Sequence, residues 1–178
     1  MTLILPVPDL KTLGAPVLRE VARAVPPAEI PHLAPLIQNL LTVMSQEHGV
    51  GIAAPQIGRS LRVMVVASRP NLRYPDAPLM EPLVLINPEL VQMDLGVVWG
   101  WEGCLSIPQQ RGWVGRSPTV TVRFHQADGT LATQTFTDFV ARIVQHEYDH
   151  LQGVLWVDRS IDRVSEAEYQ RRQGSHAG

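Results

Sequence analysis

The sequence contains a single cysteine, Cys104, among its 178 residues. One cysteine excludes an intramolecular disulfide, and with it the small secreted scaffolds that depend on such bridges. The sequence therefore predicts the cytoplasm, where thiols stay reduced. A lone thiol is either a buried, inert side chain or a reactive or metal-binding one.

Long apolar runs and a targeting segment are also missing. No stretch approaches the roughly 18 consecutive apolar residues of a membrane span, so no membrane association is predicted. The first ten residues, MTLILPVPDL, lack a basic start and contain two prolines, which argues against a signal peptide.

A strong charge of either sign is absent as well, since 15 basic and 17 acidic residues give a net charge of −2. Proteins that bind nucleic acid usually carry a broad basic surface. We therefore predict no direct nucleic-acid specificity, and any RNA-bearing partner would have to be contacted locally. With 45% hydrophobic residues, the chain is long enough for one domain with a core and short for two.

Two segments have the apolar spacing of a helix face. In residues 31–46 the apolar positions are 33, 36, 37, 40, 41 and 44. The second segment, DFVARIVQHEYDHLQG, spans residues 138–153, with Asp138 as the expected N-cap and Gly153 as the residue expected after the last turn.

Strand patterns fill the region between these helices. They are LRVMVVAS (61–68), VLINPELV, VVWGWEGCLSI and TVTVRFHQADGTLATQTF, with ADGT as a hairpin turn. The middle of the chain is therefore predicted to be antiparallel β-structure. We expect residues 1–165 to form a single catalytic domain and the polar residues 166–178 to form a frayed tail.

The stretch HEYDH in the second helix predicts a metal site. Positions i and i+4 lie one above the other on a helix, so His146 and His150 can direct their imidazoles at one ion. Glu147 lies beside them, where a carboxylate can act as general base on water acidified by the ion. A helix that merely carries two histidines is the alternative, but the pattern should arise by chance in roughly one such chain in a hundred.

A third ligand is needed to leave one position open. One large class of metallopeptidases continues the motif as HExxHxxGxxH, but here the last position is Trp156. Another class uses a downstream glutamate, for which Glu166 and Glu168 are available, and a frayed tail is a poor place for a ligand. Cys104, in WEGCLSIP, is the remaining candidate, because a thiolate binds Zn²⁺ or Fe²⁺ strongly.

A cysteine–histidine nucleophilic pair is a competing use of the same residues. That interpretation leaves His150 and Glu147 without a role, whereas a metal site uses Cys104, His146, His150 and Glu147 together. The metal interpretation is therefore favoured.

Three motifs of the chain resemble, in order and spacing, the signature motifs of the peptide deformylase family. They are GVGIAAPQ (49–56), EGCLS (102–106) and QHEYDH (145–150), and the similarity extends over about residues 4–163. The resemblance implies an α+β fold in which antiparallel sheets surround a central helix carrying HExxH. It also implies a metal-dependent hydrolase that removes the N-formyl group from the N-terminal formylmethionine of nascent polypeptides and releases formate.

The resemblance assigns roles by position. It implies that Cys104, His146 and His150 bind one divalent ion, Fe²⁺ in the cell, with Zn²⁺, Ni²⁺ or Co²⁺ as other occupants. It makes Glu147 the catalytic acid and base. Because the ligand types suit both Zn²⁺ and Fe²⁺, the residues alone leave the identity of the ion open.

Substrate contacts also follow from the resemblance. Gln56 and the backbone N–H of Leu105 would stabilise the oxyanion that forms when water attacks a formamide, and Gly51 would offer its backbone to the peptide. By position, the apolar candidates for a methionine pocket are Val50, Phe139 and Ile143. For Phe139 and Ile143, ordinary core packing is the alternative.

Charged and aromatic residues near these motifs have less defined expectations. Glu102 would orient neighbouring groups, with Arg111 or Arg116 as its partner. Arg142 would bind a carboxylate or the neighbouring loop, and a solvated or structural salt bridge is the favoured alternative. Trp101 and Trp113 flank the cysteine motif and either form a rim for the peptide or pack in the core.

A catalytically inactive descendant, which binds nascent chains or the ribosome, is the alternative function. Loss of Glu147, Cys104 or Gln56 would favour it, and all three are present. The tail has no long basic helix for a ribosome contact. A general metallopeptidase is disfavoured because Trp156 replaces the third histidine.

Overall fold

The structure is a computed structural model that describes residues 7–71 and 74–174. In these ranges it contains the helices α1 (Ala34–Gln46), α2 (Asp138–Leu151) and α3 (Glu166–Gly174). The strands are β1 (Gly51–Ala53), β2 (Val63–Ser68), β3 (Met80–Met93), β4 (Val98–Cys104), β5 (Ile107–Arg116), β6 (Thr119–His125), β7 (Leu131–Thr137) and β8 (Asp162–Ser165). Short 3₁₀ turns are η1 (Pro16–Arg19), η2 (Pro27–His32), η3 (Ala54–Ile57) and η4 (Trp156–Asp158).

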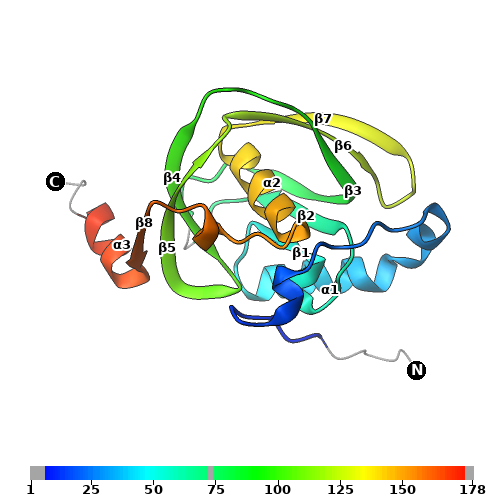
Figure 1. The fold of residues 1–178 in the computed structure, drawn as a ribbon, viewed down its shortest axis with the longest axis horizontal. Helices are drawn as coiled ribbons and strands as arrows, with labels where there is room; N and C mark the ends of the chain where they lie inside the picture. The colour runs from blue at the N-terminus through cyan, green and yellow to red at the C-terminus, as the bar shows by residue number, and fades with distance from the viewer. Residues whose placement is uncertain (1–6, 72–73, 175–178) are drawn as a thin grey trace.

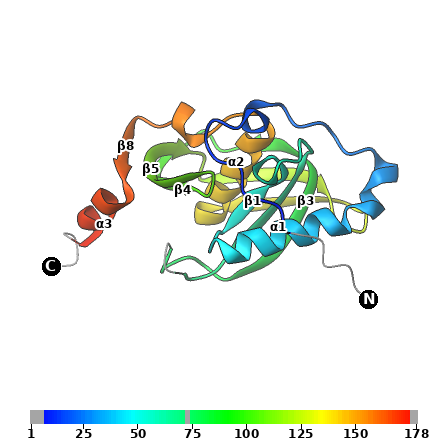
Figure 2. The same cartoon turned by 90° about the horizontal axis from the view of Figure 1, so that it is seen from below.

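The strands form two antiparallel sheets. The larger sheet has the order β1-β2-β3-β6-β7, and the smaller one has the order β4-β5-β8. Helix α2 lies between the two sheets, and α1 covers the other face of the larger sheet (Figures 1 and 2). The predicted α+β fold, with antiparallel sheets around the HEYDH helix, is confirmed.

Strand β2 shows why the sequence VMVVAS is apolar at nearly every position. Alternate side chains of a strand point to opposite faces. Met64 and Val66 join the core against α2, whereas Val63 and Val65 join the core against α1. Both faces are covered, so β2 is buried along its whole length.

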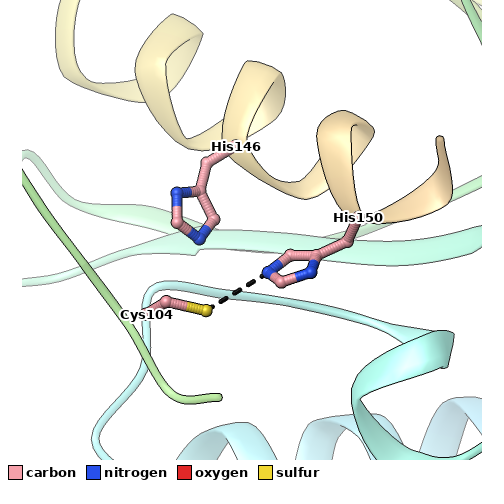
Figure 3. A group of neighbouring side chains, drawn as sticks. All are labelled: Cys104, His146 and His150. Carbon is pink, nitrogen blue, oxygen red and sulfur yellow. Dashed lines mark hydrogen bonds between the residues drawn. The ribbon is translucent and has the colours of Figure 1, made fainter. Parts of the chain in front are cut away.

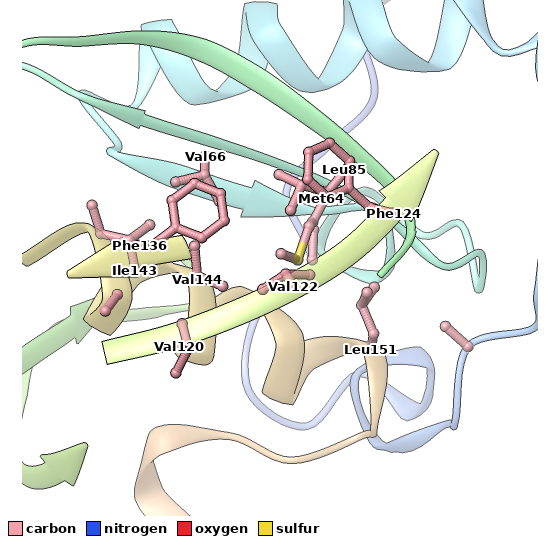
Figure 4. Close-up of a cluster of buried hydrophobic side chains, with 13 residues drawn as sticks. Met64, Val66, Leu85, Val120, Val122, Phe124, Phe136, Ile143, Val144 and Leu151 are labelled. Carbon is pink, nitrogen blue, oxygen red and sulfur yellow. The ribbon is translucent and has the colours of Figure 1, made fainter. Parts of the chain in front are cut away.

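The core between α2 and the larger sheet holds this helix in place. Val144 and Leu151 of α2 pack with Val122, Phe124 and Phe136 from the strands (Figure 4). The buried side of α2 therefore fixes its rotation about its own axis. The two histidines of HEYDH lie on its other side and point toward the smaller sheet.

The start of α2 differs from the sequence prediction. Thr137 has extended backbone angles and is the N-cap, whereas Asp138, the expected cap, is the first helical residue. Strand β7 runs straight into the helix, and the N–H of Asp138 donates to the carbonyl of Pro118 at 2.8 Å. This tertiary bond, which the local sequence does not reveal, sets the boundary.

The end of α2 agrees with the prediction. Gly153 has a φ of 71° and follows the C-cap residue Gln152. The N–H of Gly153 donates to the carbonyl of His150, and that of Val154 donates to the carbonyl of Asp149. These two bonds form a Schellman motif, which ends the helix at Leu151, directly after the last histidine.

Two further boundaries correct the sequence analysis. Residues 27–32 form the 3₁₀ turn η2, so α1 begins at Ala34 and not at residue 31. Residues 166–174 of the tail expected to be frayed instead form α3, and Glu166 at its start binds Arg111 of β5, while residues 175–178 lie outside the described residues. Tertiary contacts of this kind stabilise a short polar helix that local sequence does not favour.

No helix in the described part of the chain has the length and apolar character needed to cross a membrane.

Candidate active site

Three side chains from two elements converge beside α2. His146 and His150 lie one turn apart on α2, and Cys104 ends strand β4 (Figure 3). Their ligand atoms all lie within 4.8 Å of one another, and Sγ of Cys104 is 3.2 Å from Nε2 of His150. The structure thus brings together the three predicted ligands.

This group fits a divalent transition metal. Ligand atoms about 2.0–2.3 Å from a tetrahedral ion are about 3.3–3.8 Å apart, so only a small contraction is needed. A thiolate with two imidazoles suits Fe²⁺ or Zn²⁺. Among the described residues no other group of three such side chains meets in this way. The rejected candidate Glu166 binds Arg111 instead.

Glu102 connects His146 to a buried group of arginines. One of its carboxylate oxygens lies 2.9 Å from Nδ1 of His146, which leaves Nε2 for the ion. Arg116 donates to both oxygens at 2.8 and 2.9 Å, and Arg142 donates to one at 2.9 Å. Burial disfavours the charged carboxylate, but the hydrogen bonds from Arg116 and His146 outweigh it and hold the pKa of Glu102 well below its usual range.

The pairing of Glu102 with Arg116 decides between the two partners considered from the sequence. Arg111 is not the partner, because it points to α3. Arg142 forms the structural salt bridge considered for it, with the Glu102 carboxylate, and it also donates to the carbonyl oxygens of Val98 and Val114.

Asp149 extends this network and was not predicted. Its carboxylate accepts from Arg116 at 2.6 Å and from two nitrogens of Arg159, each at 2.6 Å. Asp149 lies inside HEYDH and is buried. Its sequence position offered one signal: an acidic residue on the buried side of α2 needs a partner of opposite charge. The network locks α2 to β5 at the level of the ligands.

The two histidines have opposite pKa shifts in the metal-free protein. Burial disfavours the charged form of His146, yet hydrogen bonds to Cys104 and Glu102 prevail and raise its pKa well above 6.5. For His150, burial and the nearby positive charge of His146 and Arg116 lower the pKa well below 6.5. His150 is therefore ready to bind an ion, whereas His146 must first lose a proton.

Glu147 is almost completely buried, with 4% of its surface exposed. Its Oε2 has no hydrogen-bond partner within the described residues. Burial is the main cause that raises the pKa of Glu147 to about 7, and the negative charge of Glu102 adds to it. A carboxyl group with this pKa can both accept and donate a proton near neutral pH.

Gly51 packs directly against this carboxylate. A Cβ at position 51 would lie 2.5 Å from Oε1 of Glu147 and 2.8 Å from Cγ2 of Ile143. The sequence analysis explained this glycine by the approach of a substrate strand. The structure adds a second reason, which is that any side chain here would displace Glu147.

Gln56 has its amide orientation fixed by its neighbours. Its Oε1 accepts from the N–H of Ala53 at 2.8 Å, so its Nε2 faces Sγ of Cys104 at 3.6 Å and Oγ of Ser106 at 3.2 Å. An amide held in this way presents N–H groups to the metal side of the site. Ser106, which helps to hold it, was not singled out from the sequence.

A cleft opens over these groups. The residues predicted to contact substrate all line it: Gly51, Val50, Gln56, Leu105, Phe139 and Ile143. Phe139 and Ile143 also pack against the core, which was the alternative considered for them. Trp101 lines the cleft, and the ring of Trp113 packs against it at an angle of 58°, with 5.1 Å between the ring centroids. Tyr74 lines it too, from a loop that gave no sequence signal.

A cysteine and two histidines beside a buried, proton-accepting carboxylate, under an apolar cleft, define the class of metal-dependent hydrolases. The family model described as polypeptide deformylase matches residues 7–166. The chain belongs to the peptide deformylase family, which removes the N-formyl group from the N-terminal formylmethionine of nascent polypeptides and releases formate. The alternative of an inactive binding module is not favoured.

Curated relatives and solved structures agree with this family. The chain is 48% identical over 161 residues to peptide deformylase 2 of Nostoc sp., covering 89% of this chain and 90% of that protein. It is 48% identical over 128 residues to peptide deformylase 2 of Shewanella oneidensis, covering 72% and 71%. The Met-Ala-Ser-bound class I type b peptide deformylase of Acinetobacter baumannii superposes with a TM-score of 0.84 at 43% identity, covering 86% of this chain and 98% of that one.

Proposed function

We propose that Cys104, His146 and His150 hold one divalent ion, Fe²⁺ in the cell, and that Zn²⁺, Ni²⁺ or Co²⁺ can replace it. The support is the donor set and its spacing, with all three ligand atoms within 4.8 Å of one another. A bound ion supplies a Lewis acid that lowers the pKa of water and polarises the formyl carbonyl.

Glu147 is the proton carrier in this proposal. Its carboxylate takes a proton from the attacking water and passes it to the amine nitrogen that leaves as formate is released. The supporting observation, on which the proposal mainly rests, is the buried Oε2 without a partner in the described residues. The pKa of about 7 makes both transfers feasible near neutral pH.

Gln56 and the backbone N–H of Leu105 stabilise negative charge on the formyl oxygen. The amide of Gln56 is fixed by Ala53, so its N–H groups need no reorganisation during the reaction. Leu105 follows the ligand Cys104 directly and lines the same cleft.

The peptide is bound as an added strand at β1. This strand is at the edge of the larger sheet, and it pairs with β2 on one side only. Main-chain groups at Gly51 can therefore pair with an extended peptide. Val50, Phe139 and Ile143 supply an apolar pocket for the methionine side chain. The Acinetobacter baumannii relative binds the peptide Met-Ala-Ser, which supports a peptide that begins with methionine as the ligand.

An anaerobic assay of formate release from a formyl-Met peptide, with metal analysis of the same sample, tests the mechanism. Glu147→Ala should keep its metal and lose turnover by roughly 10²–10⁴-fold, because the water loses its base. Glu89→Ala, at an exposed carboxylate paired with Arg123, is the control and should keep full turnover. Retained turnover in Glu147→Ala would refute the mechanism.

The proposed function also implies where in the cell the enzyme works and where it meets its substrate. We propose the cytoplasm, because the single thiol and the nascent-chain substrate both belong there. We also propose that the enzyme meets its substrate at the ribosome. Co-sedimentation with ribosomes at low and high salt tests this contact, and a complete absence from the ribosomal pellet at low salt would exclude it.

A further inference from the structure

Helix α3 lies against the outer side of the smaller sheet, away from α2 (Figures 1 and 2). None of the roles proposed above uses it. Two aromatic side chains that line the cleft, Tyr74 and Trp101, nevertheless have contacts that lead to this helix.

Arg111 of β5 is the first connection. Its side chain is fully buried, and it donates to both oxygens of Glu166 in α3, at 2.7 and 3.1 Å. Its Nη1 donates to the hydroxyl of Tyr74 at 3.2 Å. Its guanidinium also lies between two rings, 5.2 Å from the centroid of Tyr74 and 4.6 Å from that of Tyr169.

The position of Tyr74 matters for the cleft. Its ring is 5.2 Å from that of Phe139, the residue proposed for the methionine pocket. A ring held between Arg111 and Phe139 forms a wall of the cleft and not a free loop side chain.

Trp101 is the second connection. Its ring lies 6.2 Å from that of Tyr169, and the guanidinium of Arg172 is 5.7 Å from its centroid. Both of these residues belong to α3. The helix therefore supports the cleft at two separate points.

We propose that α3 is a positioning element for the peptide-binding cleft, in which Glu166 and Tyr169 hold Arg111, and Arg111 holds Tyr74 against the methionine pocket. This inference rests on the proposed binding of the peptide in this cleft. It places the boundary of the catalytic unit beyond residue 165.

The reason lies in the charge of Arg111. A buried guanidinium that loses its carboxylate partner is strongly destabilised, so it turns toward water. Without Glu166, Arg111 would leave Tyr74, and the wall of the pocket would lose its support. Helix α2 and its His146 would keep their places, because Glu102, Arg116 and Asp149 hold them through a separate network.

Steady-state kinetics on formyl-Met peptides test this role, together with binding of the unformylated peptide Met-Ala-Ser by calorimetry. Glu166→Ala should raise KM and the Kd of Met-Ala-Ser by roughly tenfold, the loss of one ordinary interaction. Its kcat and metal content should stay within about twofold of the unaltered chain. Tyr74→Phe, which removes the hydroxyl that Arg111 binds and keeps the ring, should show a smaller change in the same direction.

Glu89→Ala is the control. Glu89 forms an exposed ion pair with Arg123, and neither residue lines the cleft or belongs to α3. It should leave both constants unchanged. If Glu166→Ala fails to fold, Tyr169→Leu, which keeps every ion pair, carries the same expectation.

The outcomes separate this inference from the proposed function. Unchanged KM and Kd in a folded Glu166→Ala or Tyr169→Leu protein would overturn it. A fall in kcat with loss of metal would overturn it too, because α3 would then support the whole fold. Absence of formate release from the unaltered chain, with Met-Ala-Ser binding still dependent on Glu166, would count against the proposed function alone.

Discussion

Glu102 satisfies four donors with one buried carboxylate. Two nitrogens of Arg116, one of Arg142 and Nδ1 of His146 share its two oxygens. The affinity for an ion bound by His146 therefore depends on Glu102, although Glu102 is not itself a ligand. Groups that orient a ligand in this way affect metal affinity strongly.

Glu102→Gln should lower metal affinity by about 10- to 100-fold, because an amide cannot hold Arg116 and His146 together. A chelator competition titration measures the change. Glu89→Gln, at an exposed ion pair, is the control and should leave affinity unchanged. Equal affinities for both variants would show that Glu102 does not orient His146.

Glu147 makes a pH-dependent contribution to the stability of the metal-free protein. Its folded pKa of about 7 lies above the ordinary value of 4.5, chiefly because of burial. Between these values the unfolded chain loses a proton that the folded chain keeps, so stability falls as pH rises. Glu147→Gln cannot ionise and lacks this loss.

Urea unfolding of the two metal-free proteins therefore gives a clear expectation. From pH 4.5 to 7 the Gln variant should gain stability relative to the unaltered chain, on the order of 3 kcal/mol in total. The gain should level off above pH 7. A difference that stays constant with pH would mean that Glu147 has an ordinary pKa in the folded protein.

At the scale of elements, α2 must end directly after the second histidine. Gly153 permits this with a positive φ of 71°, and a Cβ there would meet the carbonyl oxygen of Arg19 at 2.6 Å. Gly129 in the β6–β7 hairpin has a φ of 85° but open space around it. The two glycines share the backbone requirement and differ in packing.

Gly153→Ala should therefore destabilise the protein more than Gly129→Ala. Both variants should lose about 1 kcal/mol of stability, because alanine is disfavoured in the left-handed backbone region. Only Gly153→Ala adds a steric clash with the backbone of Arg19. The free energies of unfolding, measured in urea, give the comparison. Similar free energies of unfolding for both variants would show that η1, which ends at Arg19, can move away from residue 153 without a loss of stability.

The predictability of the elements follows the range of the forces that form them. The apolar period of α2 and the alternation at the ADGT hairpin are local, so their sequences predicted them. Helix α3 depends on Glu166 reaching Arg111, 55 residues earlier, and no local pattern carries that information. The same holds for Tyr74, which reaches the cleft from a loop.

The metal ligands were predictable for a different reason. The histidines of HEYDH are local, and Cys104 was identified because it completes the set that uses every residue of the motif. The arrangement around them was not fully predictable. Arg111 and Arg116 were equivalent candidates in sequence, and only the register of β5 shows that one faces α2 and the other faces α3.

At the scale of the whole molecule, the metal group joins β4 of one sheet to the helix packed on the other. An ion bound there cross-links the two halves of the fold. Removing it with a chelator should lower the melting temperature by roughly 10 °C, if the free ion was at about 1,000 times its Kd. Thermal unfolding with and without chelator measures this difference, and equal temperatures would exclude an ion at this site.

This difference should shrink as pH falls. The pKa of His146 is raised well above 6.5 by Cys104 and Glu102 despite burial, so protons compete with the ion already near neutral pH. Metal addition to the metal-free protein should therefore release protons, which a weakly buffered titration detects. A release that grows toward high pH would contradict the raised pKa.

Strand β1 has only three residues and stands at the edge of its sheet. What it can offer to a peptide at that edge is main chain, and main chain is the same in every protein. An enzyme that binds its substrate in this way recognises the side chain of the first residue in a pocket. It has little selectivity for the side chains that follow. Binding through one short strand thus lets a single enzyme act on many proteins whose N-terminal sequences differ.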